Sequence, residues 1–253
     1  MSSRFVYQNN QYGGDILPCT LEDFNRIVDS QDVAWRIAMR QQVENAIADG
    51  LPLDDLASNG KFLGFCQKHS TEASFKKLTT EQKLQQWANS LKMGLPCFIF
   101  GASDFDLAPV MDKNGQPVVD ENGEPVMKRR RQLAGIHLSG LFMSDSDHLP
   151  MDPHEVFERT QKEGFPWQVL LAHKTSSGHG LRLVCEARPE VGNIADNQIE
   201  LARELGLLGV MGTTGKPVTD NSCIDASRIS YAPRREDIYF IDNDKLFNKL
   251  NKV

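Results

Sequence analysis

Cysteine is scarce in this sequence, and the few cysteines are widely spaced. Five are present among 253 residues, no two of them form a C-x-x-C pair, and their number is odd. A disulfide framework or a zinc cage is therefore not expected, whereas a reducing cytoplasm is. The cysteines are Cys19, Cys66, Cys97, Cys185 and Cys223.

Apolar runs long enough to cross a bilayer are also missing. The first residues, MSSRFVYQNNQYGGD, lack the basic start and the apolar core of a signal peptide. We therefore expect a soluble cytoplasmic protein without a membrane partner.

Positive charge is not in excess, because the formal net charge at pH 7 is -6. This argues against a protein that coats nucleic acid with its whole surface, but it is compatible with a local basic groove. The length and an apolar content of 40% predict a full hydrophobic core, in one large domain or two small ones.

The first third of the sequence has the pattern of helices. Residues 31–49 place apolar side chains at near-helical spacing, and Thr79 stands three residues before Gln82 in a capping pattern. The stretch LPCFIFGAS is rich in strand-forming residues and predicts a buried strand. We expect a mostly helical region over residues 1–93 and an α/β region over residues 94–253, packed as one compact unit.

Two copies of an eight-residue unit follow in DKNGQPVVDENGEPVM, each with an Asn-Gly turn signal. We expect an exposed hairpin insertion, because two copies are too few for a solenoid. A basic run then leads directly into the next strand; it consists of Lys128, Arg129, Arg130 and Arg131.

After this insertion, predicted strands and helices alternate. A strand, a helix, a second strand, a tight turn and a third strand predict an α+β fold with a split βαβ sheet. The predicted segments are a strand at 132–145, a helix at 151–164, strands at 167–175 and 181–187, a helix at 193–206, a strand at 238–242 and a final helix from 243.

Asp145 and Asp147 end the first of these strands in LFMSDSDHLP. Side chains alternate along a strand, so the two carboxylates share one face, with their Cα atoms roughly 6.5 to 7 Å apart. Such a pair can hold a hard divalent cation together with substrate phosphates. A strand-ending turn, in which Asp147 bonds to the backbone, explains the same residues.

The turn SSGHG lies between the second and third of these strands. Its glycines allow the backbone to approach a ligand closely, and Ser177 and His179 then project toward that ligand. Lys174 and Arg182 add the positive charge that an anionic triphosphate requires. An ordinary glycine-rich hairpin with an exposed histidine accounts for the same pattern.

A third segment, VTDNSCIDASRISYAPRR, combines acidic and basic residues. Asp225 and Arg228 are also correctly spaced for a simple local ion pair. The charged residues of the segment are Asp220, Asp225, Arg228, Arg234 and Arg235.

Taken in order, these segments resemble the archaeo-eukaryotic primase superfamily, the primase-polymerases. Its motifs are an acidic pair at a strand end, an S-x-H turn, and a later acid after an apolar residue. The segments LPCFIFGASD, LSGLFMSDSDHL, SSGHGLRL and DNSCIDASRISYAP look like the branch related to VirE N-terminal domains, found in replication proteins of bacterial mobile elements. The resemblance covers roughly residues 94–235.

The third acid of the motif has two candidates. Asp225 follows the apolar Ile224, as the motif requires, whereas the spacing of D…D-x-S-R favours Asp220. The acidic pair also departs from the family, because its middle residue is the polar Ser146.

The resemblance implies a primase-type mixed sheet with an RRM-like catalytic module. It implies DNA-dependent nucleotidyl transfer that makes or extends primers in the replication of a mobile element, phage or plasmid. It further implies that Asp145, Asp147 and either Asp220 or Asp225 hold two Mg²⁺ or Mn²⁺ ions, and no zinc is expected. The nucleoside triphosphate is contacted by Ser177 and His179, with Lys174 or Arg228.

Single-stranded DNA is the template that the resemblance implies. We expect its phosphates to contact the basic run and the late arginines, and Tyr231 is a candidate for stacking on a base. No G-x-x-x-x-G-K-[ST] motif is present, so a helicase partner is expected in another chain or in a longer form of this one. The DNA-binding candidates are Lys128, Arg129, Arg130, Arg131, Arg234 and Arg235.

Two other function classes compete with a polymerase. One is a catalytically silent replication initiator or DNA-binding module, since a fold does not determine its function. The other is a relaxase-like nuclease, which uses a His-x-His pair that this sequence lacks.

Overall fold

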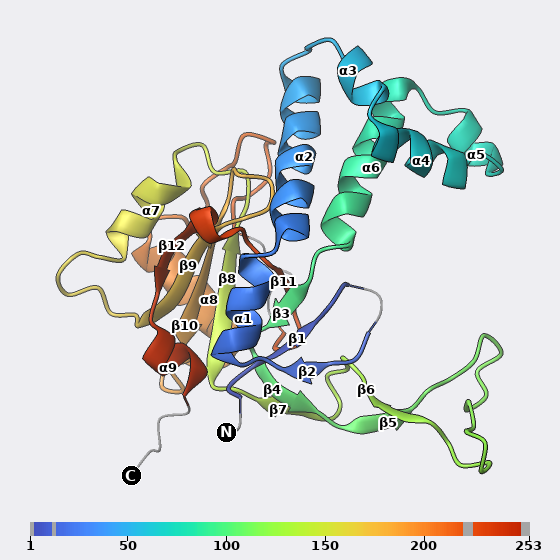
Figure 1. Ribbon diagram of the computed structural model, residues 1–253. Helices are drawn as coiled ribbons and strands as arrows, with labels where there is room; N and C mark the ends of the chain where they lie inside the picture. The colour runs from blue at the N-terminus through green and yellow to red at the C-terminus, as the bar shows by residue number, and fades with distance from the viewer. Residues whose placement is uncertain (1–2, 12–13, 220–224, 249–253) are drawn as a thin grey trace.

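The structure is a computed structural model that describes residues 3–11, 14–219 and 225–248. It has an α+β fold, as the sequence predicts, and the strand pairs of the described residues are all antiparallel, so the sheets are not of the expected mixed type. Figure 1 shows a central sheet, a group of helices from residues 31–93 at the top and upper right, and an extended arm at the lower right. We call this group of helices the helical layer. The first elements are β1 (Val6–Gln8), β2 (Leu17–Pro18), α1 (Leu21–Val28), α2 (Gln31–Ala48), α3 (Asp54–Ala57), α4 (Gly60–Lys68), α5 (Ala73–Lys76) and α6 (Thr80–Met93).

The second part of the chain forms most of the strands. It contains β3 (Cys97–Ile99), β4 (Ala102–Phe105), β5 (Leu107–Pro109), β6 (Met127–Arg129), β7 (Ile136–Leu138), β8 (Leu141–Ser146), α7 (Pro153–Arg159), β9 (Val169–Lys174), β10 (Leu181–Glu186), α8 (Ile194–Glu204), β11 (Ser230–Tyr231), a 3₁₀ helix (Arg235–Asp237), β12 (Ile238–Ile241) and α9 (Asn243–Phe247). Among the described residues, no helix has both the length and the apolar composition needed to span a membrane.

The central sheet has four strands in the order β12-β9-β10-β8, and each neighbouring pair is antiparallel. β8 and β9 both pair with β10, so they run parallel to each other on its two sides, and α7 joins them along the chain. On the other side of β8, a single β-bridge pairs Ser146 with Thr219. The end of β8 is therefore enclosed by neighbouring backbone on both sides.

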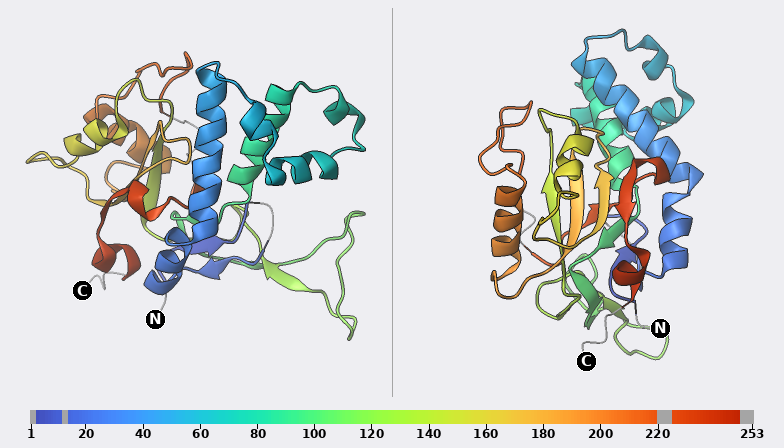
Figure 2. Two further views of the ribbon diagram at one scale, coloured as in Figure 1. Left: turned by 45° about the horizontal axis from the view of Figure 1, so that its top comes forward. Right: turned by 90° about the vertical axis from the view of Figure 1, so that its left-hand side faces the viewer.

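Different helices cover the two faces of the central sheet. On one face, Phe142 packs in a cluster with Val156 of α7 and Leu201 of α8. On the other face, Met143 belongs to a cluster that includes Ile37 of α2 and residues of α1. The right-hand view of Figure 2 shows α8 and α2 on opposite sides of the sheet.

A second sheet, in the order β11-β3-β1-β2, draws strands from both ends of the chain. β1 and β2 lie within the region for which the sequence indicates mainly helices, and they are only three and two residues long. Segments this short show no alternation of apolar and polar side chains, so the sequence pattern does not reveal them. β1 is buried, with Tyr7 in a cluster that contains Phe5, Phe24, Phe98 and Phe100, whereas both residues of β2 are exposed.

The helical layer is attached to the sheets through α2. The first half of this helix buries Val33 and Ile37 against the central sheet. Its second half buries Val43 in a separate cluster with Leu84 and Trp87 of α6. The capping box expected at the start of α6 is present, with Thr79 and Gln82 bonded to each other's backbone. One continuous helix thus belongs to two hydrophobic cores.

The insertion forms the exposed arm that the sequence predicts (Figure 1). In its first repeat, Asp112 Oδ1 accepts hydrogen bonds from the backbone N–H groups of Asn114 (2.8 Å) and Gln116 (2.9 Å). Asp120 makes the same pair of contacts in the second repeat. Each turn is closed by a glycine with positive φ, such as Gly115 at +77°.

The predicted strand over residues 132–145 is wrong in its extent. It divides into β7 and β8, and Gly140 between them has a φ of +81°. β7 pairs with β4 in a separate two-stranded sheet, while β8 enters the central sheet. A residue with positive φ cannot continue a strand, so the chain changes sheets at this glycine.

Candidate functional site

The acidic pair lies at the end of β8, where both carboxylates project from the same face of the sheet. Asp145 is opposite Arg182 of β10 in the strand register, and their side chains form a buried ion pair. Arg182 also donates a hydrogen bond to Ser230 Oγ on β11, at 3.1 Å. The first carboxylate is thus held between the two sheets by an arginine.

Asp147 follows β8 directly, and its N–H donates to the carbonyl of Val218 at 2.9 Å. Its carboxylate lies beside Gly180: a Cβ atom on that glycine would lie 2.8 Å from Asp147 Oδ1 and 2.6 Å from the carbonyl oxygen of Ser146. Gly180 and Arg182 are two residues apart, so their side-chain directions agree. Asp147, beside Gly180, and Asp145, beside Arg182, therefore share one face of the sheet even though the residue between them is the polar Ser146. A joint metal site depends on this shared face.

The S-x-H turn joins β9 to β10 next to these carboxylates. It is closed by hydrogen bonds between the backbone of Thr175 and Gly180 (2.9 Å) and from the N–H of Gly178 to Thr175 (2.9 Å). Gly178 has a φ of +82°, which favours glycine. Ser177 Oγ lies 3.0 Å from Thr175 Oγ1, and His179 Nε2 lies 3.5 Å from Asn45 Oδ1 on α2.

A cavity of about 540 Å³ opens between this turn, the end of β8 and the helical layer. This volume falls within the usual range of small-molecule sites, about 300 to 1,000 Å³. Of the residues expected from the sequence to act on a nucleotide or a metal, Asp147, Ser177 and His179 line it. The other lining residues are Arg40, Glu44, Asn45, Ala48, Gln85, Lys92, His148, Thr175, Ser176, Arg182, Thr213, Thr214 and Tyr231.

Residues of the helical layer also line this site, and no sequence pattern predicts them there. Arg40 bonds to Glu44 Oε1 through Nε (3.0 Å) and a terminal nitrogen (2.9 Å), and it donates to Ser176 Oγ of the turn. Lys92 lines the cavity from the last turn of α6. Burial lowers the pKa of Lys92, and the positive charge of Arg40 lowers it further, whereas Asp147 acts in the opposite direction.

His173 continues the row of polar side chains across the central sheet, because it is opposite Arg182 on β9. Its Nδ1 lies 2.6 Å from the carbonyl oxygen of Lys174, which can only accept, so Nδ1 carries the proton. No hydrogen-bond partner of Nε2 is found among the described residues. Burial, followed by the positive charge of Arg182, lowers the pKa of His173 to about 3.

Two of the predicted nucleotide-binding residues are not brought to the cavity. Lys174 points to the opposite face of the sheet, where its ammonium lies 5.9 Å from the centroid of the Tyr239 ring. Arg228 is absent from the described cavity lining, and its N–H donates to the carbonyl of Asp225 at 3.3 Å. Neighbouring side chains of a strand point to opposite faces of the sheet. His173 shares the face of Arg182, so the next residue, Lys174, points away from the cavity.

The two candidates for the third acid are placed differently. Asp220 lies outside the described residues. Asp225 Oδ1 accepts hydrogen bonds from the N–H (2.8 Å) and the hydroxyl (2.5 Å) of Ser227, and Asp225 is not among the described residues that line the cavity. The turn around Asp225 lies against the connection between β3 and β4, since a Cβ on Gly101 would lie 2.6 Å from the carbonyl oxygen of Ala226.

The basic residues expected to contact DNA lie in two places: Lys128 to Arg131 in and after β6, and Arg234 with Arg235 at the start of the 3₁₀ helix. Lys128 pairs with Asp15 at 3.0 Å, while Arg130 and Arg131 line a second groove of about 390 Å³ together with Gln11. Gln11 accepts a hydrogen bond from Tyr231, which lines the first cavity, so the two hollows adjoin.

The remaining arginines already have acidic partners. Arg129 pairs with Asp104 at 2.5 Å, and Arg234 pairs with Asp237 at 2.7 Å. Arg235 contacts both carboxylate oxygens of Asp29, at 2.8 and 2.9 Å.

Oxygen donors for a divalent cation are available at the cavity edge. Asp145 and Asp147 offer carboxylates on one face of the sheet, and hard cations such as Mg²⁺ bind one or two carboxylates together with substrate phosphates. Within the part of the chain that the structure describes, no cluster of three or more His, Cys, Asp or Glu side chains suitable for a metal is found. The donor set thus fits a cation that shares its coordination with a phosphate ligand.

The chain matches no protein-family model, and no curated protein or solved structure is significantly similar to it. The likeness to primase-polymerases therefore rests on the sequence motifs alone.

Proposed function

We propose that this protein is a DNA-dependent nucleotidyltransferase, a primase-polymerase that makes or extends primers on single-stranded DNA. The observation that supports this proposal is the convergence of Asp147, Ser177 and His179 on one cavity, although the sequence separates the acid from the turn by thirty residues. Arg182 adds a cation to the same cavity. An acid beside cations and hydroxyls suits a triphosphate with its metal.

The topology of the central sheet also supports an RRM-like catalytic module. In a split βαβ unit, two parallel strands joined by a helix lie on either side of a third strand. β8, α7 and β9 have this relation to β10. The acidic pair lies at the end of the first strand and the S-x-H turn follows the second, so the topology itself places the motifs side by side.

The residues of the cavity divide the chemistry between them. Asp147 in the cavity, with Asp145 beside it, would hold a divalent cation, Mg²⁺ or Mn²⁺, together with the triphosphate. When bound, this cation lowers the pKa of the attacking 3'-hydroxyl and neutralises charge on the leaving pyrophosphate. Ser177 and His179 donate hydrogen bonds to phosphate oxygens, and Arg182 adds a charge-assisted contact. Arg40 holds the turn in position through Ser176.

The template strand is proposed to reach the cavity from the groove lined by Arg130 and Arg131. Gln11 lies in that groove and bonds to Tyr231 in the cavity. Arginines along such a path contact phosphates without reading sequence, and binding then weakens as salt is raised.

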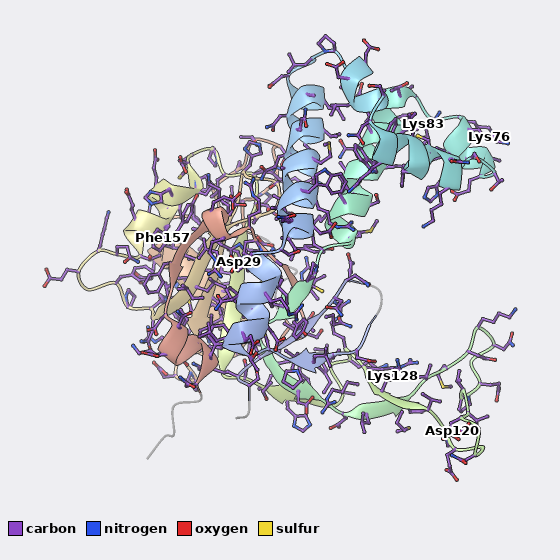
Figure 3. All side chains as sticks on the ribbon, viewed as in Figure 1. Asp29, Lys76, Lys83, Asp120, Lys128 and Phe157 are labelled. Carbon is purple, nitrogen blue, oxygen red and sulfur yellow. The ribbon has the colours of Figure 1, made fainter. Side chains whose placement is uncertain are left out.

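Primer extension tests this function. Asp147→Asn removes the carboxylate charge and keeps the side-chain shape, and we expect metal-dependent incorporation of nucleotides to fall by at least a hundredfold. Asp120→Asn at the tip of the arm (Figure 3) is the matched control and should retain full activity. Equal product from wild type and Asp147→Asn contradicts the assignment.

One observation favours the alternative of a catalytically silent DNA-binding module. Asp145 is engaged by Arg182 in a buried ion pair, and this pair competes with metal binding by Asp145. The alternative predicts salt-dependent DNA binding with no product under any metal condition. If the wild-type protein binds DNA but makes no product with either Mg²⁺ or Mn²⁺, the result supports this alternative.

A further inference from the structure

The helical layer contributes to the cavity a positive charge without a close acidic partner. Lys92 is partly buried, and its Nζ lies 5.1 Å from the centroid of the Tyr231 ring. Within residues 3–11, 14–219 and 225–248, no carboxylate oxygen lies within 4.0 Å of this ammonium. Burial disfavours the ammonium, and the charges of Asp147 and Asp145 oppose this effect without contacting Lys92, so the site gains free energy when an anion enters.

The other cations of the cavity already have carboxylate partners. Arg40 bonds to Glu44, and Arg182 bonds to Asp145. Their guanidinium groups nevertheless act on Lys92, since both lower its pKa. Three cations from α2, α6 and β10 thus meet in one cavity, and the Lys92 ammonium is the one best placed to bind an external anion.

We propose that Lys92 binds the polyphosphate group of a nucleoside triphosphate, so that the helical layer completes the nucleotide site of the sheet. This inference rests on the proposed function, and it specifies which part of the chain recognises the triphosphate. A multiply charged anion is required, because it must reach Lys92 while its other oxygens contact Ser177 and the hydroxyls of Thr213 and Thr214 across the cavity. A nucleoside without phosphates offers no such bridge.

Lys92→Met tests this role, because it removes the charge and keeps a long, flexible side chain. Isothermal titration with inorganic tripolyphosphate and with dATP, each in the presence and absence of Mg²⁺, measures the change. We expect affinity for both to fall about tenfold, which corresponds to about 1.4 kcal/mol. Deoxyadenosine binding should stay within about twofold of wild type, and Lys92→Arg should restore most of the loss.

Lys83→Met is the matched control, since Lys83 belongs to the same helix. Its ammonium lies 5.5 Å from the centroid of the Phe75 ring, and Figure 3 shows it in the outer part of the helical layer, near α4 and α5. Tripolyphosphate binding by this variant should equal that of wild type. Unfolding temperatures of all variants establish that they are folded.

The outcomes separate this inference from the proposed function. Tripolyphosphate binding that depends on Lys92, in a protein that makes no DNA product, supports the inference and refutes the polymerase. DNA synthesis by Lys92→Met with an unchanged KM for nucleotide supports the polymerase and overturns the inference. Undiminished binding of tripolyphosphate by Lys92→Met overturns it as well.

Discussion

At the scale of single residues, the buried polar row of the central sheet makes stability depend on pH. The folded-state pKa of His173 is lowered to about 3, so the unfolded chain binds one more proton than the folded protein between about pH 3 and pH 6.5. This contribution is fully present above pH 6.5 and is lost as the pH falls toward 3. We expect a loss of about 2 kcal/mol between pH 7 and pH 5.

Chemical denaturation of wild type and His173→Leu across this range measures the effect. The free energy of unfolding of wild type should fall more steeply with acidification than that of His173→Leu. The difference in slope should correspond to nearly one additional proton taken up on unfolding. Parallel curves for the two proteins would show that His173 is protonated equally in the folded and unfolded states.

The face shared by Asp145 and Asp147 could be predicted from the sequence, because alternation along a strand fixes it. The role of Lys174 could not. Alternation places Lys174 and His173 on opposite faces, but only the pairing of His173 with Arg182 shows which face meets the cavity. Lys92 carries no sequence signal, since its position depends on how α6 packs against the sheet.

At the scale of elements, the close approach of the S-x-H turn to β8 depends on one glycine. A Cβ at Gly180 would lie 2.6 Å from the carbonyl oxygen of Ser146, 2.7 Å from Thr175 Oγ1 and 2.8 Å from Asp147 Oδ1. Gly180→Ala should therefore push the turn away from β8. We expect a loss of about 1 to 3 kcal/mol in the free energy of unfolding, together with weaker tripolyphosphate binding.

Gly64→Ala in α4 is the control for this substitution. Apart from the adjacent residues and the backbone of its own helix, no atom of the described residues lies within 4 Å of the Cβ that it adds, and alanine favours a helix over glycine. Thermal and chemical unfolding should show this variant to be as stable as wild type or up to about 1 kcal/mol more stable. A Gly180→Ala protein as stable and as active as Gly64→Ala would mean that the turn tolerates displacement.

Among the elements, those with long periodic patterns or capping motifs could be predicted. α6 with its capping box and α7 with Pro153 after the cap Asp152 both begin where the sequence indicates. The very short strands β1, β2 and β11 could not, because they become strands only by pairing: β1 and β11 pair with β3, and β2 pairs with β1. The sequence predicts β7 and β8 as one strand, because the φ of a glycine within an apolar run cannot be inferred from the sequence.

At the scale of the whole molecule, α2 links the helical layer to the catalytic candidates. Its side chains belong to two hydrophobic cores, and between them Arg40 and Gln41 contact the turn at Ser176. Residues of α2 and α6 therefore line the candidate site, and α2 also packs against the sheet that carries it. No pattern within the helices announces this, because the contact joins residues more than a hundred positions apart in the chain.

The central claim is that one cavity holds a divalent cation against Asp147 and a triphosphate against Lys92. A crystal structure with Mn²⁺ and a non-hydrolysable deoxynucleoside triphosphate tests it most directly. We predict anomalous Mn²⁺ density in contact with Asp147 and phosphate oxygens within hydrogen-bond distance of Lys92 and Ser177. Mn²⁺ and triphosphate bound elsewhere, with this cavity containing neither, would contradict it.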